Sequence, residues 1–270
     1  MENLIRLGAA LGIFGIMVSW EAIKPRRAQQ VSRRQRWPVN LGFALLNMVL
    51  MRLTIGGLAY TSAVVAAEHG FGLLNIWRVS TGFSIIMTLL ILDFAIYGQH
   101  ILMHKWPILW RLHKIHHTDL EFDATTAVRF HPLEIVISMF YKAVCIVLIG
   151  GNPAAIIVFE IILNGAATFN HSNVRISDKV DKILRWLVIT PDMHRIHHSA
   201  EAIETDSNYG FSISCWDRLC KTYTAEPKHS QTTMHIGLSA YRKQDDLGFM
   251  QCLRIPFKAQ ANVKDNGQIS

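Results

Sequence analysis

Five apolar runs limit what this chain can fold into. The longest, residues 41–67, exceeds the ~20 residues that a helix needs to cross a hydrocarbon core about 30 Å thick. Inside lipid every backbone polar group must be hydrogen-bonded within the protein, so spanning runs form helices. We therefore predict an all-α, integral-membrane helical bundle of four or five spans. The runs comprise residues 7–20, 41–67, 80–97, 132–148 and 153–169.

The first run permits more than one interpretation. Only Arg6 precedes residues 7–20, and no A-x-A-like cleavage site follows them, which favours a retained span or anchor over a signal peptide. We choose five spans with the N-terminus outside. The alternative is four spans, with residues 7–20 lying in the membrane interface.

The composition is typical of a membrane protein and not of a nucleic-acid-binding one. Half of the residues are hydrophobic and only 17% are charged, with a mean hydropathy of +0.22. The net charge of +7 would suit nucleic acid, but such proteins are more polar and carry a recognisable motif. We therefore expect no nucleic-acid partner and assign the excess to cytoplasmic loops beside anionic headgroups. The four cysteines show no CxxC spacing, so neither a disulfide framework nor a zinc ribbon is indicated.

A cluster of cations after the first run marks the cytoplasmic side, where Lys and Arg are enriched. The turn signal at residues 150–153, Gly-Gly-Asn-Pro, predicts a helical hairpin whose ends lie on one side. Counting spans then puts the histidine-rich segments on the cytoplasmic side, and we expect a multi-pass protein of a bacterial inner membrane. The cations are Lys24, Arg26, Arg27, Arg33, Arg34 and Arg36.

Three regions follow from this organisation. Residues 1–80 would hold the N-terminal spans and the basic loop, and residues 81–225 a catalytic domain that includes the membrane hairpin 132–169. Residues 226–270 would form a cytoplasmic tail, with its last dozen residues frayed. Within residues 81–225, one apolar helical stripe predicts a helix lying in the membrane surface, although a core-facing helix explains the stripe about as well. The stripe comprises Val180, Ile183, Leu184, Leu187 and Val188.

Eight of the thirteen histidines fall in three groups: one HxxxH and two HxxHH. Residues four apart share a helix face and can converge on one ion, whereas neighbours diverge by about 100° and can serve two. Eight imidazoles exceed what one first-row ion accepts, so we predict a dinuclear centre in a cytoplasmic helical cap. Imidazole suits Zn, Cu, Fe and Ni alike. The groups are His100 and His104; His113, His116 and His117; His194, His197 and His198.

Local signals place these groups on helices. Thr190, Pro191 and Asp192 supply an N-cap, a proline at the first helical position and an acid just before the last group. Pro107 opens a new helix for the middle group, so the helix of the HxxxH pair should end near Lys105 or Trp106.

Further polar residues lie on faces near the histidines. Asp93 and Tyr97 share a helix face with the HxxxH pair, and we expect Asp93 to orient a ligand histidine. His131 is a candidate ligand or a neighbour of one. On the second hairpin helix Glu160, Asn164 and His171 share one stripe; we expect His171 to reach the metals, and Glu160, Asn164 and Tyr97 to lie along the substrate path. Helix–helix hydrogen bonding within the bundle explains Glu160 and Asn164 about as well.

The pattern of histidine groups resembles the fatty acid hydroxylase/sterol desaturase superfamily of integral-membrane, non-haem di-iron oxygenases. The resemblance covers roughly residues 85–225 and departs from the family at Cys220-Lys221-Thr222, where Phe-Gly-Thr is common. Within the matching segments Asn173, Asp192 and Asn208 are further candidates for ligands or neighbours of ligands. The segments are HILMH, HKIHH, RFHPLE, NHSN, TPDMHRIHHS, NYG and WDRL.

The resemblance implies O₂-dependent hydroxylation or desaturation of a lipid by two iron ions, with zinc as an ion that the protein can carry when purified. It implies a lipid substrate (a fatty acyl chain, a sterol-like or another lipid) entering from the bilayer, and an external electron donor of the ferredoxin or cytochrome type. A basic cytoplasmic surface would receive an acidic donor. The oligomeric state stays open.

Two alternatives compete with this interpretation. A membrane zinc hydrolase would use the same histidines to activate water, although HExxH is absent from the sequence. A metal transporter or sensor would need ionisable residues along a path across the bilayer, whereas here they crowd one face.

Overall fold

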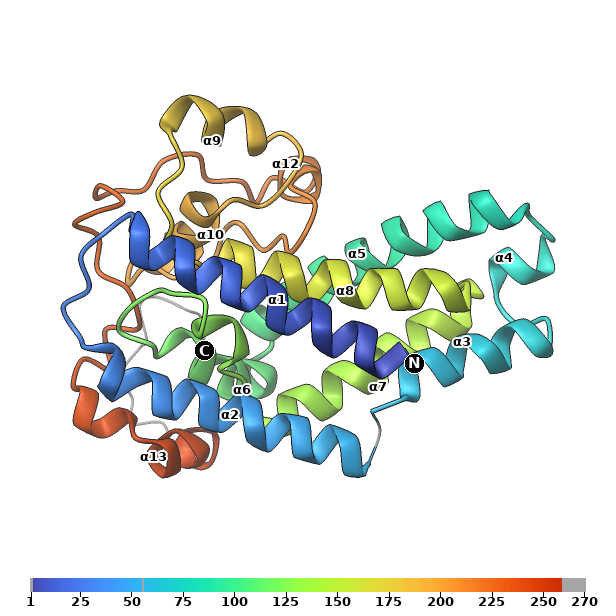
Figure 1. Cartoon of the computed structure of the whole chain (residues 1–270), viewed down its shortest axis with the longest axis horizontal. Helices are drawn as coiled ribbons and strands as arrows, with labels where there is room; N and C mark the ends of the chain where they lie inside the picture. Colours follow the sequence, from blue (N-terminus) through green and yellow to red (C-terminus); the bar gives the residue numbers. More distant parts are fainter. Residues whose placement is uncertain (1, 55, 259–270) are drawn as a thin grey trace.

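The computed structural model describes residues 2–54 and 56–258, with side chains from Ile5 onward, and in that part of the chain the regular elements are helices. Long helices gather at one end of the molecule and shorter ones form a cap at the other (Figure 1). The helices are α1 (Glu2–Ile23), α2 (Arg33–Leu53), α3 (Leu58–Glu68), α4 (Leu73–Ile76), α5 (Thr81–Lys105), α6 (Pro107–His117), α7 (Pro132–Ile149), α8 (Pro153–Asn170), α9 (Asp178–Leu184), α10 (Pro191–His197), α11 (Ala202–Thr205), α12 (Cys215–Leu219) and α13 (Phe249–Arg254), with short 3-10 turns at Thr126–Val128, Gln244–Leu247 and Ile255–Phe257.

The long helices form the membrane bundle that the apolar runs predict. Five segments are long and apolar enough to cross a bilayer by length and composition, which agrees with the expected four or five spans. In the bundle α1 lies along α8, α3 packs on α7 and α8, and α5 packs on both helices of the hairpin (Figure 1). Their outward side chains are apolar and exposed, as lipid contact requires.

The run at residues 41–67 is not the single helix that its length suggested. The structure divides it into α2 and α3, and α2 begins well before the run, at Arg33. At the break, a side chain at Gly56 would come 2.7 Å from the carbonyl oxygen of Met51, and Gly57 is the N-cap of α3. Two consecutive glycines thus let the backbone fold closely past the end of α2.

The turn of the membrane hairpin is where the sequence predicted it. Gly150 has φ of 70°, a left-handed conformation that suits glycine, and a side chain at Gly72 would meet its backbone nitrogen at 2.1 Å. Asn152 then caps α8 by accepting hydrogen bonds from the backbone N–H groups of Ala154 and Ala155. The tip of the hairpin is therefore packed backbone to backbone against the loop before α4.

A buried ion network joins the bundle to the cap. Arg36 of α2 binds Asp119 at 2.6 Å and Asp123 at 2.7 Å, and Asn40 donates to Asp119 at 2.9 Å. Burial acts to raise the pKa of Asp119, but the adjacent Arg36 guanidinium holds it well below its usual range. Removing one partner would leave a buried charge unpaired, so this network fixes the segment that follows α6.

The helix predicted around residues 180–188 is shorter than its stripe. α9 ends at Leu184, and the stripe is exposed: Ile183 is 67% and Leu187 66% accessible. The alternative of a core-facing helix is therefore wrong for this segment, whose buried face instead carries Asp181, paired with Arg185.

The segment after residue 225 packs across the cap as far as it is described. Met234 and Ile236 share an apolar cluster with Phe122, and α13 packs against α2. The expected fraying of the last dozen residues falls on residues 259–270, which lie outside the described residues.

Candidate metal centre

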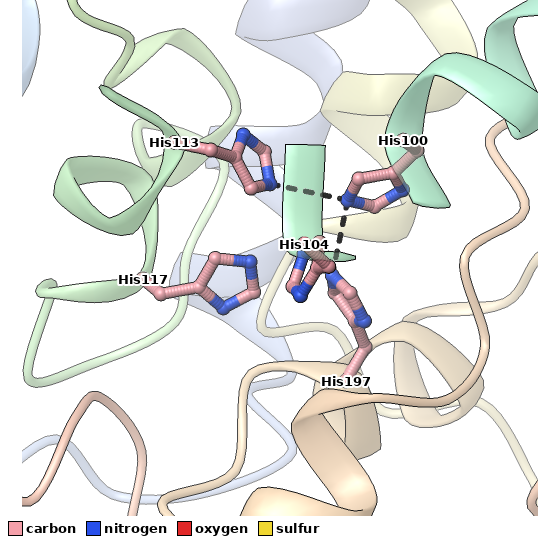
Figure 2. Close-up of side chains that lie close together, drawn as sticks. All are labelled: His100, His104, His113, His117 and His197. Carbon is pink, nitrogen blue, oxygen red and sulfur yellow. Dashed lines mark hydrogen bonds between the residues drawn. The ribbon is translucent and has the colours of Figure 1, made fainter. Parts of the chain in front are cut away.

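Nine buried histidines meet at the junction of bundle and cap. They come from the end of α5, from α6, from the residue after α8, and from α10 and its C-cap residue. Their ring nitrogens form two groups, and within each group one ring nitrogen per residue lies within 4.8 Å of the others. We call these the five-histidine group and the four-histidine group. The five-histidine group, drawn in Figure 2, is His100, His104, His113, His117 and His197, and the four-histidine group is His116, His171, His194 and His198.

The two HxxHH segments each supply both groups. In α6, His113 and His117 join the five-histidine group and His116 the four-histidine group. In α10 and its C-cap the assignment is reversed: His194 and His198 join the four-histidine group and His197 the five-histidine group. Residues four apart therefore stay together, while the member three along from the first points the other way, as the 100° step of a helix allows.

Local sequence creates this convergence. α5 ends at Lys105, Trp106 is extended, and Pro107 starts α6, as predicted. The sharp turn folds α6 back against α5, so that Nε2 of His113 lies 3.2 Å from Nε2 of His100. At α10 the hydroxyl of Thr190 accepts from the backbone N–H of Met193, with Pro191 at the first helical position, again as predicted.

Hydrogen bonds fix the tautomers of three rings in the five-histidine group. Nδ1 of His100 lies 2.7 Å from the carbonyl oxygen of Tyr209, and Nδ1 of His197 lies 2.7 Å from that of Ser207. Nδ1 of His113 lies 2.6 Å from Oε1 of Glu134. Carbonyl and carboxylate oxygens only accept, so all three Nδ1 atoms carry hydrogens and each Nε2 of a neutral ring presents a lone pair.

These lone pairs point at one another. Nε2 of His100 is 3.2 Å from Nε2 of His113 and 3.1 Å from Nε2 of His197, the two contacts drawn as dashed lines in Figure 2. With each neutral ring carrying its hydrogen on Nδ1, neither nitrogen of such a pair has a hydrogen to donate. Such an arrangement is repulsive without a cation between the nitrogens. The donor set therefore fits a metal ion that accepts imidazole, held by rings whose far nitrogens are already oriented.

In the four-histidine group the ring nitrogens converge on His171, the one member whose Nδ1 is hydrogen-bonded to a carbonyl oxygen among the described residues. Its Nδ1 lies 2.7 Å from the carbonyl oxygen of Ala167, and its Nε2 lies 3.0 Å from Nε2 of His116 and 3.1 Å from Nε2 of His194. Across both groups, several buried ring nitrogens have no hydrogen-bond partner among the described residues. They are both nitrogens of His104, His117 and His198, and Nδ1 of His116 and His194.

Burial favours the neutral form in eight of these rings. It lowers the pKa of His171 to about 4 and that of His197 to about 3. Burial, followed by the neighbouring rings, also lowers the pKa of His116, His117 and His198 well below the usual value. Neutral imidazole is the form that binds a metal, so near pH 7 these side chains are ready to coordinate.

The remaining candidates lie outside both groups. His131 caps α7, with Nδ1 accepting from the N–H of Leu133. Asp93 does not orient a histidine: its carboxylate accepts from the indole of Trp216 at 2.8 Å and from the N–H of Ile213, so it secures the cap segment.

Three other candidates hold neighbouring segments through backbone hydrogen bonds or ion pairs. Asn173 exchanges hydrogen bonds with the backbone of Arg27, and Asp192 binds Arg195 and Arg26. Asn208, with φ of 51°, donates to the carbonyl oxygens of Met193 and Thr224.

The sequence did not single out Glu134, although it is the one carboxylate hydrogen-bonded to a member of either group among the described residues. In the sequence it is an acid in the first turn of a helix, which the helix dipole alone would explain. The carbonyls of Tyr209, Ser207 and Ala167, which orient three other rings, leave no signal in the sequence.

A cavity of about 350 Å³ leads from the five-histidine group into the bundle. His100 and His113 line it at one end, and Glu160 and Asn164 are also part of its wall; that a substrate passes along them stays a prediction. Tyr97 is not part of its wall and instead bonds Thr222 through its hydroxyl. The volume falls in the range of small-molecule sites, about 300–1,000 Å³.

Comparison with known proteins identifies one family and several relatives. The family model described as fatty acid hydroxylase matches residues 85–222. The chain is 28% identical to the ornithine lipid hydroxylase OlsE of Rhizobium tropici over 69% of its own length and 54% of that protein's. It is 32% identical to the alkylglycerol monooxygenase of Xenopus tropicalis over 52% of the chain and 30% of that protein, and 24% identical to the cholesterol 25-hydroxylase of Rattus norvegicus over 54% of the chain and 48% of that protein.

These matches cover about a third to a half of each relative's length. No solved structure matches the chain. The matched segment, residues 85–222, contains all nine histidines of the two groups.

Proposed function

Because this chain belongs to the fatty acid hydroxylase family, we propose that it is a membrane-bound lipid hydroxylase or desaturase whose nine histidines hold two iron ions. Bound there, the irons would supply O₂-dependent oxidation of an unactivated C–H bond, with two electrons from an external donor and, in hydroxylation, one oxygen atom entering the lipid while the other leaves as water. The family and the histidine-rich site support a lipid oxidoreductase. We propose, in addition, that the metal is iron, that the reaction is hydroxylation or desaturation, and that the electrons come from an external donor.

One observation carries the dimetal assignment, the opposed Nε2 lone pairs of His100, His113 and His197. In the other group, Nε2 of His116 and Nε2 of His194 both approach the Nε2 lone pair of His171. Each group presents more imidazoles than hydrogen bonding can satisfy, and neutral imidazole suits iron. Glu134 and the carbonyls orient the rings, which lowers the cost of assembling each site.

The protein's own contribution is to position the lipid and exclude water. Apolar side chains of α5, α7 and α8 line most of the cavity beside His100 and His113. An alkyl segment in this cavity would be held against the five-histidine group, away from bulk water. The electron donor, of the ferredoxin or cytochrome type, would approach the cap, whose basic residues complement an acidic partner.

Metal analysis and turnover test the proposal together. Protein purified without oxygen and reconstituted with iron should bind two irons per chain and consume O₂ when a reductant and membrane lipids are added. Lipidomics of cells with and without the protein should show lipids that gain one oxygen or lose two hydrogens. The matched control is His69→Ala, which removes an exposed histidine far along the chain from the site.

The competing metal chemistry has a different outcome. If the reconstituted protein holds two zincs, is inert toward O₂ and hydrolyses an ester, amide or peptide, the oxygenase assignment is wrong. Zinc content alone does not decide, because His-rich sites load zinc during expression.

A further inference from the structure

The end of the cavity away from the histidines carries a charge cluster whose Glu160 and Lys142 are buried and whose Arg6 side chain is 24% accessible. Glu160 of α8 is bound on one oxygen by Arg6 of α1, at 2.5 Å, and on the other by Lys142 of α7, at 2.8 Å. All three side chains line the cavity, and Glu160 and Lys142 are buried. We call this trio the Arg6–Glu160–Lys142 cluster.

The cluster holds more positive than negative charge. Two cationic side chains share one carboxylate, and both oxygens of that carboxylate are already engaged. The other described charged side chain in the cavity wall is Glu134, which is held at the histidine end by His113. A net charge inside a membrane bundle is costly unless an opposite charge joins it. Structural pairing alone would need only one of the two cations.

The distance from the cluster to the histidines follows from α7. Glu134, Ser138 and Lys142 are spaced i, i+4, i+8, so all three share one face of the helix, and all three line the cavity. With a rise of about 1.5 Å per residue, Lys142 lies about 12 Å along the helix from Glu134. Between the two ends the wall is mostly apolar, with Ile96 and Met139 among its residues.

We propose that the Arg6–Glu160–Lys142 cluster binds the carboxylate of a lipid, whose alkyl chain runs along the cavity toward His100 and His113. A carboxylate would neutralise the excess charge and accept charge-assisted hydrogen bonds from Lys142 and Arg6. The inference rests on the proposed function for its reactive end, and it adds a substrate class and a position. The bond attacked lies about 12 Å from the carboxylate and is not adjacent to it.

Binding to metal-free protein tests the subsite independently of catalysis. The purified full chain, in lipid nanodiscs, would be titrated with three probes of equal chain length: hexadecanoic acid, N-hexadecanoylglycine and hexadecanol. Wild-type protein should bind at least one carboxylate probe about 10–100-fold more tightly than the alcohol, the range expected for a hydrogen bond to a charged group. A stronger response to the free acid or to the acylglycine identifies which source of carboxylate fits.

Substitutions at Lys142 assign the preference to the cluster. Lys142→Met leaves the Arg6–Glu160 pair neutral and should abolish the preference without weakening hexadecanol binding. Lys142→Arg should keep it, and Lys243→Met, at an exposed position in the cap region, should leave it unchanged. Unchanged hexadecanol binding shows that Lys142→Met is folded.

Two results would overturn the inference: equal binding of acid and alcohol by the wild type, or a preference that survives Lys142→Met. If only the proposed oxygenase activity is wrong, the protein will still prefer the carboxylate probe but will not turn over a lipid. An oxygenase that turns over but shows no carboxylate preference would contradict only the subsite.

Discussion

The two histidine groups share helices but differ in what surrounds them. The five-histidine group lines the cavity through His100 and His113 and is oriented partly by the carboxylate of Glu134. None of the four-histidine group is among the described cavity-lining residues. Its member His171 is oriented by a backbone carbonyl and lies 5.5 Å from the ring of Phe122. If both groups hold metal ions, as proposed, the ion in the five-histidine group would face the cavity and the ion in the four-histidine group would not.

Removing a histidine from the smaller group should have the largest effect. His116→Ala leaves that group three imidazoles, and we expect turnover below about a hundredth of wild type, since even losing a partner of a ligand costs about 10–100-fold. Metal content should fall while the protein stays inserted in the membrane. His104→Ala leaves four imidazoles in the larger group and should retain more metal. An active, fully metallated His116→Ala protein would contradict the ligand assignment.

Replacing the carboxylate of Glu134 should lower the metal affinity of one group more than that of the other. Glu134→Gln keeps the shape near His113 but removes the negative charge, and we expect a loss of about 10–100-fold in metal affinity or activity. The loss should be largest in the five-histidine group, so metal titration of the variant should populate a half-filled protein, with the four-histidine group occupied, that the wild type does not accumulate. Glu68→Gln, at an exposed position at the end of α3, is the control. Equal weakening of both sites would show that Glu134 does not act on the five-histidine group in particular.

Acid should destabilise the metal-free protein through buried histidines of both groups. Folding lowers the pKa of His171 to about 4 and that of His197 to about 3, from 6.5, so the unfolded chain binds more protons below pH 6.5. The stability is fully present above pH 6.5 and is lost progressively as the pH falls toward 4 and then 3. Thermal unfolding of the cap followed by circular dichroism should show this decline. A constant midpoint between pH 7 and pH 4.5 would contradict it.

The smallest expected effect concerns the helix that both groups share. Thr190→Ala removes the N-cap of α10 and should cost about 1 kcal/mol of stability, measured by thermal denaturation. Because α10 carries members of both groups, both sites should weaken alike, in contrast to Glu134→Gln. Thr190→Ser keeps the hydroxyl and should behave as wild type; a selective loss at one site would show that the helix does not act on both.

Sequence reasoning succeeded where the cause is local. Pro107, Thr190 and Asn152 act on helices within a few residues, so the starts of α6, α10 and α8 could be predicted. The histidine spacing likewise indicated that neighbours diverge, and His116 and His117 do belong to different groups.

The rest depended on contacts between distant segments. Asp93 shares a face with His100, yet its partners are more than a hundred residues away in the cap, so its role could not be read from spacing. Glu134 resembles any acid at a helix start until α7 is placed against α6. The division of residues 41–67 depends on how closely two glycines pass the end of α2.

The division of the α6 and α10 histidines between the two groups should affect how metal ions bind. Each helix carries members of both groups, so an ion in either group would immobilise rings that belong to the other. The second ion then binds to rings that are already ordered, so its affinity is higher. By thermodynamic reciprocity, binding of the second ion raises the affinity for the first by the same factor. We therefore expect metal to load as a pair, with a binding curve steeper than that of two independent sites and little of the half-filled protein at intermediate metal concentrations.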